Sequence, residues 1–208
     1  MENLIEKYNV SRETFDKLKT YEASLIEWQN KFNLVSNNSL SDAWNRHFLD
    51  SVQLMEYIPN NAKSLLDFGS GAGFPAMVLA VLAQQLQPKL KITLIESIKK
   101  KTVYLNTVRK ICDLDVTVVN DRIENLPQQK TDVITSRAMC NLSDLFKYAY
   151  RFTTKNTIMI FPKGKSYQAE LDNAKKQWRF NYQIKENKVC NEGVILVINH
   201  LSPLKGVK

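Results

Sequence analysis

Histidine and cysteine are scarce in this chain of 208 residues. The two histidines, His47 and His200, are too few to build a metal cluster. The three cysteines, at positions 112, 140 and 190, are odd in number and form no C-x-x-C pair. This pattern predicts neither a zinc site nor a disulfide framework, so we expect reduced thiols and no bound metal.

Long apolar runs are also missing. None is long enough to cross a bilayer, and the first residues lack the basic start and apolar block of a signal peptide. We therefore expect a cytoplasmic protein without a membrane partner. A composition of 44% hydrophobic and 24% charged residues is ordinary for a soluble protein, and the length suits one domain with a short appendage.

Positive charge is distributed unevenly along the chain, whose formal net charge is +8. Residues 1–60 hold six basic and nine acidic side chains, a net of −3, whereas residues 61–208 hold 23 and 12, a net of +11. A polyanionic partner, most simply nucleic acid, fits this distribution better than a small neutral substrate does. An ordinary solvated surface is the alternative.

The first 60 residues have a helical pattern, with apolar side chains three or four positions apart. Ser11 is typical of a helix start. A break is expected over residues 33–39, followed by a second helix that begins near Ser41 and stops at Pro59. We interpret residues 1–60 as a helical extension rather than an independent domain.

Short apolar strands alternate with helices over residues 61–208. This alternation predicts an α/β domain with a mostly parallel sheet covered on both faces. Five strands are expected at residues 64–68, 90–95, 116–119, 132–135 and 157–161, and a terminal strand pair at 180–185 and 193–199.

A glycine loop, residues 67–75, follows the first predicted strand. Gly69, Gly71 and Gly73 have the spacing G-x-G-x-G, and glycine permits a close approach of ligand to backbone. Dinucleotide loops use G-x-G-x-x-G to hold a pyrophosphate, which the carboxylate of Asp67 would repel. A cationic cofactor with an amino-acid head, such as S-adenosylmethionine, fits better, and a bare strand-to-helix turn is the alternative.

Ligands of open α/β sheets bind beyond the carboxyl ends of the strands. Glu96 ends the second strand, where its carboxylate is expected to accept both hydroxyls of a ribose, although a dehydrogenase would use it identically. Ile123 and Glu124 follow the third strand, where an apolar side chain can cover adenine and a polar neighbour can meet its amino group.

Basic residues stand at the same edge. Arg122 and Arg137 follow the third and fourth strands, and the arginine fork matches phosphates and the O6/N7 edge of guanine. A salt bridge, for instance with Asp121 or Asp132, is the alternative for each arginine.

Two further basic segments and one histidine complete the candidate site. Lys163 and Lys165 flank a glycine after the fifth strand and suit a phosphate track. At least one lysine of residues 99–101 is expected to reach the crevice. His47 is a candidate contact between the extension and the crevice, with simple packing as the alternative.

Five motifs stand in order along residues 25–170. They are F-N-L-V at 32–35, R-H-F-L-D-S at 46–51, the glycine loop at 67–75, S-R-A at 136–138 and K-G at 163–164. In their order and spacing they resemble the RsmG family, also called GidB. The resemblance implies a class I (Rossmann-like) methyltransferase fold with a seven-stranded sheet. It also implies S-adenosylmethionine as cofactor, and methylation of guanine N7 in the decoding region of 16S rRNA, free or in the small ribosomal subunit.

The resemblance also implies roles for residues at matching positions. The family's cofactor-binding positions correspond to Gly69, Phe74, Ile123, Glu124 and Arg137. Basic residues expected to serve the RNA or the site correspond to Arg122, Lys100 and Lys165. The chain departs from the family pattern at Ala76, where glycine is common, and at residues 192–194, where a basic residue usually opens the last strand.

The missing motifs agree with N7 chemistry. The chain has no Pro-Cys, which pyrimidine C5 methylation would need, and no Asn/Asp-Pro-Pro-aromatic loop for adenine amines. Guanine N7 carries a free lone pair, so we expect no general base and give Arg137 and Arg122 orienting roles. The alternatives are a methyltransferase for a small molecule or protein, a non-catalytic nucleotide or RNA sensor, and a dehydrogenase. We expect a monomer.

Overall fold

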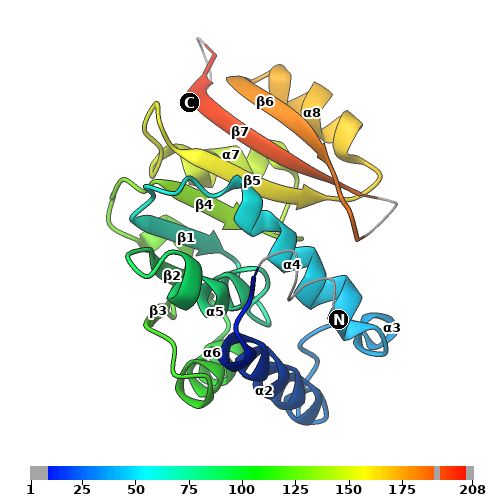
Figure 1. The fold of residues 1–208 in the computed structure, drawn as a ribbon. Coiled ribbons are helices and arrows are strands. Elements are labelled where there is room, and N and C mark those ends of the chain that lie inside the picture. The colour runs from blue at the N-terminus through cyan, green and yellow to red at the C-terminus, as the bar shows by residue number, and fades with distance from the viewer. Residues whose placement is uncertain (1–8, 190–192, 205–208) are drawn as a thin grey trace.

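The computed structural model describes residues 9–189 and 193–204. At its centre lies a seven-stranded sheet in the order β3-β2-β1-β4-β5-β7-β6 (Figure 1). The first five strands pair in parallel, and β7 runs antiparallel to both β5 and β6. This confirms the predicted sheet, with bounds β1 Ser64–Phe68, β2 Lys91–Ile95, β3 Val116–Val119, β4 Val133–Ser136, β5 Ile158–Lys163, β6 Trp178–Glu186 and β7 Val194–Pro203.

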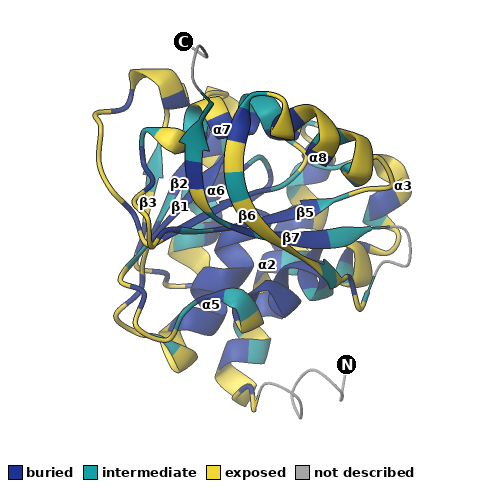
Figure 2. Ribbon diagram, turned by 90° about the horizontal axis from the view of Figure 1, so that it is seen from above, coloured by how far each residue is buried: buried dark blue, intermediate teal, exposed yellow. Residues whose placement is uncertain are grey.

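Helices cover both faces of the sheet, and Figure 2 shows the buried strands between them. The helices of the extension are α2 Arg12–Gln29, α3 Asn37–Leu40, η1 Trp44–Leu49, α4 Asp50–Val52 and η2 Gln53–Tyr57. Those of the α/β domain are α5 Ala76–Leu86, α6 Lys99–Ile111, η3 Ile123–Asn125, α7 Leu142–Tyr150 and α8 Tyr167–Lys175.

Side chains of the strands alternate between two hydrophobic cores. Leu65 belongs to the core beneath α2, α4, α5 and α6, whereas Leu66 and Phe68 belong to the core beneath α7 and α8. By the same alternation Asp67 faces the first core, the one that the extension helps to build.

The extension is part of that first core. Leu18, Tyr21 and Leu25 of α2 are completely buried, and they pack with the apolar side chains of α5 and α6. Ser11 caps α2 as predicted, accepting the N–H of Thr14 at 3.1 Å. The predicted boundary near residue 60 stays a prediction, because the extension and the α/β domain share one hydrophobic core and no structural division separates them there.

The predicted second helix of the extension is present as the unbroken run of η1, α4 and η2 over residues 44–57, close to its predicted start near Ser41, and a separate short helix precedes it. Helix α3 starts at Asn37, inside the predicted break, after the extended residue Ser36. The break is short because the side chain of Gln29 accepts the N–H groups of Leu34 and Val35, at 2.9 and 3.1 Å. Residues 44–49 then form a π-helical turn, a feature frequent at functional sites.

Cys112 and Cys140 are free thiols, as predicted, and Cys190 lies outside the described residues. Within residues 9–189 and 193–204, no group of three His, Cys, Asp or Glu side chains is placed to hold a metal ion. In the same part of the chain, no helix is both long and apolar enough to cross a membrane.

Candidate active site

The glycine loop turns sharply between β1 and α5 because its three glycines have positive φ values, +64° for Gly69, +56° for Gly71 and +96° for Gly73. A Cβ on Gly73 would lie 2.6 Å from the hydroxyl of Tyr21 and 2.8 Å from Met77 Cγ. Gly73 therefore serves close packing of the loop on the extension, rather than an approach to ligand.

Glu96 and Tyr21 hold the loop from two sides. The carboxylate of Glu96 accepts the N–H of Gly71 and that of Ile98, both at 2.8 Å. Each of its oxygens keeps a second lone pair, which leaves capacity for the predicted ribose contact. From the extension, Tyr21 donates its hydroxyl to the carbonyl of Ala72 at 2.5 Å.

Asp67 lies completely buried beneath the loop. Its Oδ1 accepts the hydroxyl of Thr135 at 2.6 Å, while its Oδ2 has no hydrogen-bond partner among the described residues. Burial raises the pKa of this carboxyl to about 6. An orphaned carboxylate oxygen is costly unless something cationic or a donor approaches it.

Arg137, directly after β4, reaches across to the extension. Its Nη2 lies 2.8 Å from His47 Nδ1, and its Nη1 donates to the carbonyl of Arg46 at 3.1 Å and pairs with Asp50 at 3.3 Å. The guanidinium carbon lies 5.1 Å from the ring centre of Phe74, on which the His47 ring also stacks at 4.9 Å. A salt bridge, which was the alternative interpretation of Arg137, is present, and its partner is Asp50.

His47 is a neutral hydrogen-bond acceptor for Arg137. Burial, followed by the charge of Arg137, lowers the pKa of His47 to about 3. Since arginine can only donate, Nδ1 accepts, and Nε2–H donates to Ser39 Oγ at 3.0 Å. Ser39 in turn donates its hydroxyl to the carbonyl of Ser36, which leaves its oxygen free to accept from His47. The Nε2–H tautomer of His47 therefore agrees with both hydrogen bonds.

Asp50 links Arg137 to the turn between β6 and β7. Its second oxygen accepts the amide of Asn187 at 2.7 Å and that of Gln53 at 3.1 Å. Gln53 also donates to Asn187 at 2.9 Å and accepts the N–H of Lys188. Three segments far apart in sequence thus fix one guanidinium.

Two cavities meet at Arg137. The smaller, about 440 Å³, lies against the glycine loop, and the larger, about 950 Å³, lies between the extension and the loops after β4 and β5. Arg46, Arg137 and Ala138 line both cavities.

The structure brings together about half of the predicted site. Gly69, Gly71, Phe74, His47 and Arg137 line the smaller cavity, and Lys163 and Lys165 line the larger. Neither cavity is lined by Asp67, Gly73, Glu96, Lys100, Arg122, Ile123 or Glu124. Ile123 is buried in the second core, and Arg122, Glu124 and Lys100 are exposed, so their roles stay predictions.

Sequence reasoning missed several residues of the site. Lys101 is the lysine of residues 99–101 that reaches the smaller cavity, and helical periodicity could have selected it over Lys100. Tyr21 and Asn187 carry no local motif. Asp50 lies four positions after Arg46, a spacing typical of an ion pair along one helix. In the structure its carboxylate pairs with Arg137 instead.

These residues fit S-adenosylmethionine. The unpartnered Oδ2 of Asp67 lies beneath a loop whose backbone is open to the smaller cavity at Gly69 and Gly71. A positively charged ligand with an ammonium group supplies what that carboxylate lacks, whereas a pyrophosphate would add to its charge. The cavity volume lies within the usual range for small-molecule sites.

This strand order, with a glycine loop after β1 and a carboxylate at the end of β2, defines a class I, Rossmann-like S-adenosylmethionine-dependent methyltransferase. The fold is similar to that of a SAM-dependent methyltransferase from Aquifex aeolicus, with a TM-score of 0.57 at 18% identity over 77% of this chain and 95% of that one. It is also similar to MtNAS in complex with MTA and tNA, with a TM-score of 0.54 at 12% identity over 90% and 70%.

The chain belongs to the family described as rRNA small subunit methyltransferase G, or GidB, whose sequence model matches residues 14–198. Two proteins named ribosomal RNA small subunit methyltransferase G are similar to it. That of Ruegeria sp. (strain TM1040) is 41% identical over 83% of each chain. That of Rickettsia prowazekii (strain Madrid E) is 36% identical over 94% of this chain and 98% of its own.

Proposed function

We propose that this enzyme methylates N7 of guanine 527 in 16S rRNA, within the RNA or the small ribosomal subunit, as a cytoplasmic monomer. Family membership supports small-subunit rRNA as the substrate. The excess of positive charge in residues 61–208 favours a polyanionic partner.

The absence of an available general base carries the choice of N7. His47 is neutral, but its Nδ1 accepts from Arg137 and its Nε2–H is engaged by Ser39. Asp50 is already shared by Arg137, Asn187 and Gln53. Of the described residues that line both cavities, Arg46, Arg137 and Ala138, none is a base at neutral pH, and N7 has no proton to lose.

When bound in the smaller cavity, S-adenosylmethionine would supply an electrophilic methyl group, which the lone pair of guanine N7 can accept without losing a proton. The protein has to hold the two partners in line, and such positioning contributes roughly 7–11 kcal/mol. Asp67 would face the ammonium group, Gly69, Gly71 and Phe74 would line the amino-acid end, and Glu96 would accept the ribose hydroxyls. Ile123 and Glu124 would meet the adenine.

Arg137 is the residue we propose to orient the guanine, because it stands between the cavities and has four fixed partners. Lys163 shapes the wall instead of contacting RNA, since its ammonium is paired with Glu170 at 2.8 Å and donates to the carbonyl of Cys140. Arg122 and Lys100 lie exposed outside the cavities, where they would contact more distant phosphates.

The deciding measurement is transfer of labelled methyl groups to 16S rRNA, naked and within small subunits that lack this modification. We expect label on one guanine, with N7-methylguanine as the only methylated base. An Arg137→Lys variant keeps the charge but loses the planar fork, so its turnover should fall about 100-fold, the cost of a misplaced reactant.

Label on another atom or another RNA would contradict the proposal. So would an Arg137→Lys variant with wild-type turnover, because the guanidinium would then have no orienting role.

A further inference from the structure

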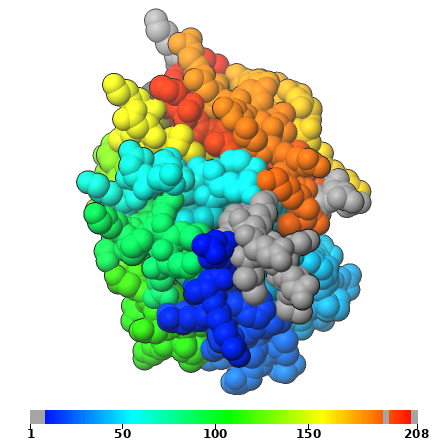
Figure 3. All heavy atoms as spheres, in the orientation of Figure 1, coloured from blue at the N-terminus to red at the C-terminus, as the bar shows by residue number. Residues whose placement is uncertain are grey.

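One open surface of the molecule lies outside both cavities. β6 is the last strand of the sheet; it pairs with β7 on one side, and no other described strand pairs with its second side. Figure 3 shows the orange atoms of this part of the chain on the surface, beside the red atoms of β7. We call residues 173–185, the end of α8 and most of β6, the β6 edge.

A row of aromatic side chains runs out of the core along β6. Trp178 is buried against Phe146, and Phe180 packs on the same ring with 4.8 Å between the ring centres. The ring centre of Tyr182 lies 5.7 Å from that of Phe180, and 36% of the residue is exposed. Ile184 comes last on this face, with 43% exposed. The row therefore ends on the surface in two large side chains that the core covers only in part.

Positive charge follows the same residues. The β6 edge holds no acidic side chain and four basic ones, Lys175, Lys176, Arg179 and Lys185. Lys175 donates to the hydroxyl of Tyr182 at 3.0 Å and lies 4.8 Å from its ring centre, and it also pairs with Asp172 at 4.0 Å. The side chains of Arg179 and Lys185 form no hydrogen bond or ion pair with the residues that the structure describes. They leave β6 on the face opposite Tyr182, and the two faces meet at the open edge.

These cations and exposed side chains favour a nucleic acid over a second copy of this chain. Pairing of β6 with β6 of another copy would bring like charges together, and cations along an edge strand oppose such pairing. Bases of unpaired RNA stack on exposed aromatic rings with little regard to sequence, while Lys and Arg bind the phosphates. The β6 edge offers both kinds of contact side by side.

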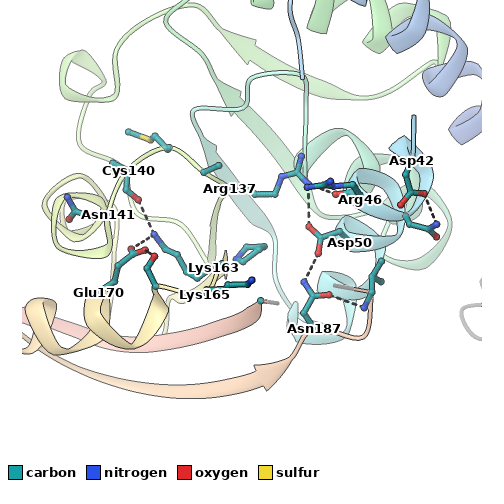
Figure 4. A pocket seen from close by; sticks show the side chains of 18 residues that line it. Asp42, Arg46, Asp50, Arg137, Cys140, Asn141, Lys163, Lys165, Glu170 and Asn187 are labelled. Carbon is teal, nitrogen blue, oxygen red and sulfur yellow. Dashed lines mark hydrogen bonds and ion pairs between the residues drawn. The ribbon is translucent and has the colours of Figure 1, made fainter. Parts of the chain in front are cut away.

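The β6 edge leads toward the candidate active site. β7 is antiparallel to both β5 and β6, so β6 ends on the same side of the sheet as the parallel strands do. Its last residue, Glu186, precedes Asn187, whose amide donates to Asp50 at 2.7 Å beside Arg137 (Figure 4). An RNA chain that enters the site can therefore continue along β6.

We propose that the β6 edge binds an unpaired segment of small-subunit rRNA, separate from the target nucleotide. A base stacks on Tyr182 next to Ile184, and Arg179 and Lys185 bind phosphates. This assignment rests on the proposed function, because it takes rRNA as the substrate. It concerns binding and not the methyl transfer itself, since no residue of the β6 edge lines either cavity.

The test measures binding of the full-length protein to small ribosomal subunits lacking the modification, over a range of salt concentrations, together with methyl transfer. Each phosphate contact contributes about 0.7–0.9 to the slope of log K against log salt. Arg179→Ala with Lys185→Ala should therefore lower the slope by about 1.4–1.8 and raise KM for the subunit about tenfold. The kcat and the affinity for S-adenosylmethionine should stay unchanged, because neither side chain lines a cavity.

The aromatic contact is tested separately from the charges. Tyr182→Leu removes the ring and should weaken binding to the subunit about tenfold with little change in the salt slope, because stacking releases no counterions. Tyr182→Phe keeps the ring and should bind as the wild type does.

Lys89→Ala with Lys155→Ala is the matched control. It removes the same charge from exposed lysines that precede β2 and β5, at the edge of the sheet opposite the candidate site. If this pair and the pair at Arg179 and Lys185 give equal slopes while the wild type still produces N7-methylguanine, the β6 edge is not an RNA contact and the proposed function survives.

Two further outcomes would also overturn the assignment. A wild-type dimer in sedimentation that Ile184→Lys dissociates would show that a second copy covers β6. A wild type that binds no small subunit and methylates no RNA would remove the proposed function together with this one.

Discussion

His47 shows how a single residue changes meaning between sequence and structure. A histidine near a crevice is first considered for proton transfer or RNA contact, yet this ring is buried, neutral and hydrogen-bonded at both nitrogens. Its contacts favour positioning of Arg137. Because the pKa of His47 is lowered to about 3, its protonation contributes to activity only in strong acid.

Asp67 is the residue whose titration should be visible in cofactor binding. Its pKa of about 6 means that the carboxyl of the free protein is mostly protonated at pH 5 and ionised at pH 7. Since the ionised form attracts an ammonium group, affinity for S-adenosylmethionine should rise several-fold from pH 5 to 7, with proton release on binding at the lower pH.

Calorimetric titration across this pH range measures that rise. Asp67→Asn keeps an acceptor for Thr135 but cannot ionise, so it should bind more weakly with an affinity independent of pH. A wild-type affinity for S-adenosylmethionine that does not change between pH 5 and 7 would show that the charge of Asp67 does not contribute to cofactor binding. The free protein, conversely, loses the stability that Asp67 contributes as pH rises from the ordinary aspartate range to about 6, because over that range the folded state binds more protons than the unfolded state.

At the scale of elements, the junction of β1 and α5 depends on a backbone that only glycine adopts easily. Gly73→Ala would combine a φ of +96° with a Cβ 2.6 Å from Tyr21 and 2.8 Å from Met77. We expect a loss of roughly 2 kcal/mol or more of unfolding free energy, measured by denaturant titration. Gly164→Ala, whose new Cβ meets nothing within 4 Å, should change it by less than about 0.5 kcal/mol.

Equal stabilities of the two alanine variants would show that the loop relaxes around the added methyl. The close packing of the glycine loop on the extension would then make no difference to the stability of the Gly73→Ala variant.

At the scale of the whole molecule, the extension forms part of the candidate active site, where its residues line the smaller cavity. Figure 3 shows atoms of residues near 50 lying in a band between the start of the extension and the C-terminal strands. Arg46, His47 and Asp50 all lie in this segment, and Tyr21 holds the glycine loop from α2. Cofactor binding and the stability of the extension should therefore be coupled.

Tyr21→Phe tests this coupling with little change in volume. It leaves the buried carbonyl of Ala72 without its donor, which should cost about 1–3 kcal/mol of stability and weaken S-adenosylmethionine binding several-fold. Tyr104→Phe is the matched control, because the buried hydroxyl of Tyr104 has no hydrogen-bond partner among the described residues. Its removal should leave both quantities unchanged or improved.

If Tyr21→Phe binds the cofactor as tightly as Tyr104→Phe does, the hydrogen bond from Tyr21 to Ala72 does not couple the extension to cofactor binding. Thermal unfolding and calorimetry on the same samples separate the two effects.

The sequence by itself determined the sheet, the glycine loop and the class of cofactor, because periodic burial, glycine spacing and strand-end residues are local signals. It also indicated the residues near the crevice, including Arg137 and His47. Only the tertiary structure decided which distant groups meet: Asp50 with Arg137 instead of the nearby acidic residues, and Tyr21 with the glycine loop. These two contacts join residues 87 and 51 positions apart, and no local pattern encodes which distant groups meet when two faces of a sheet are covered.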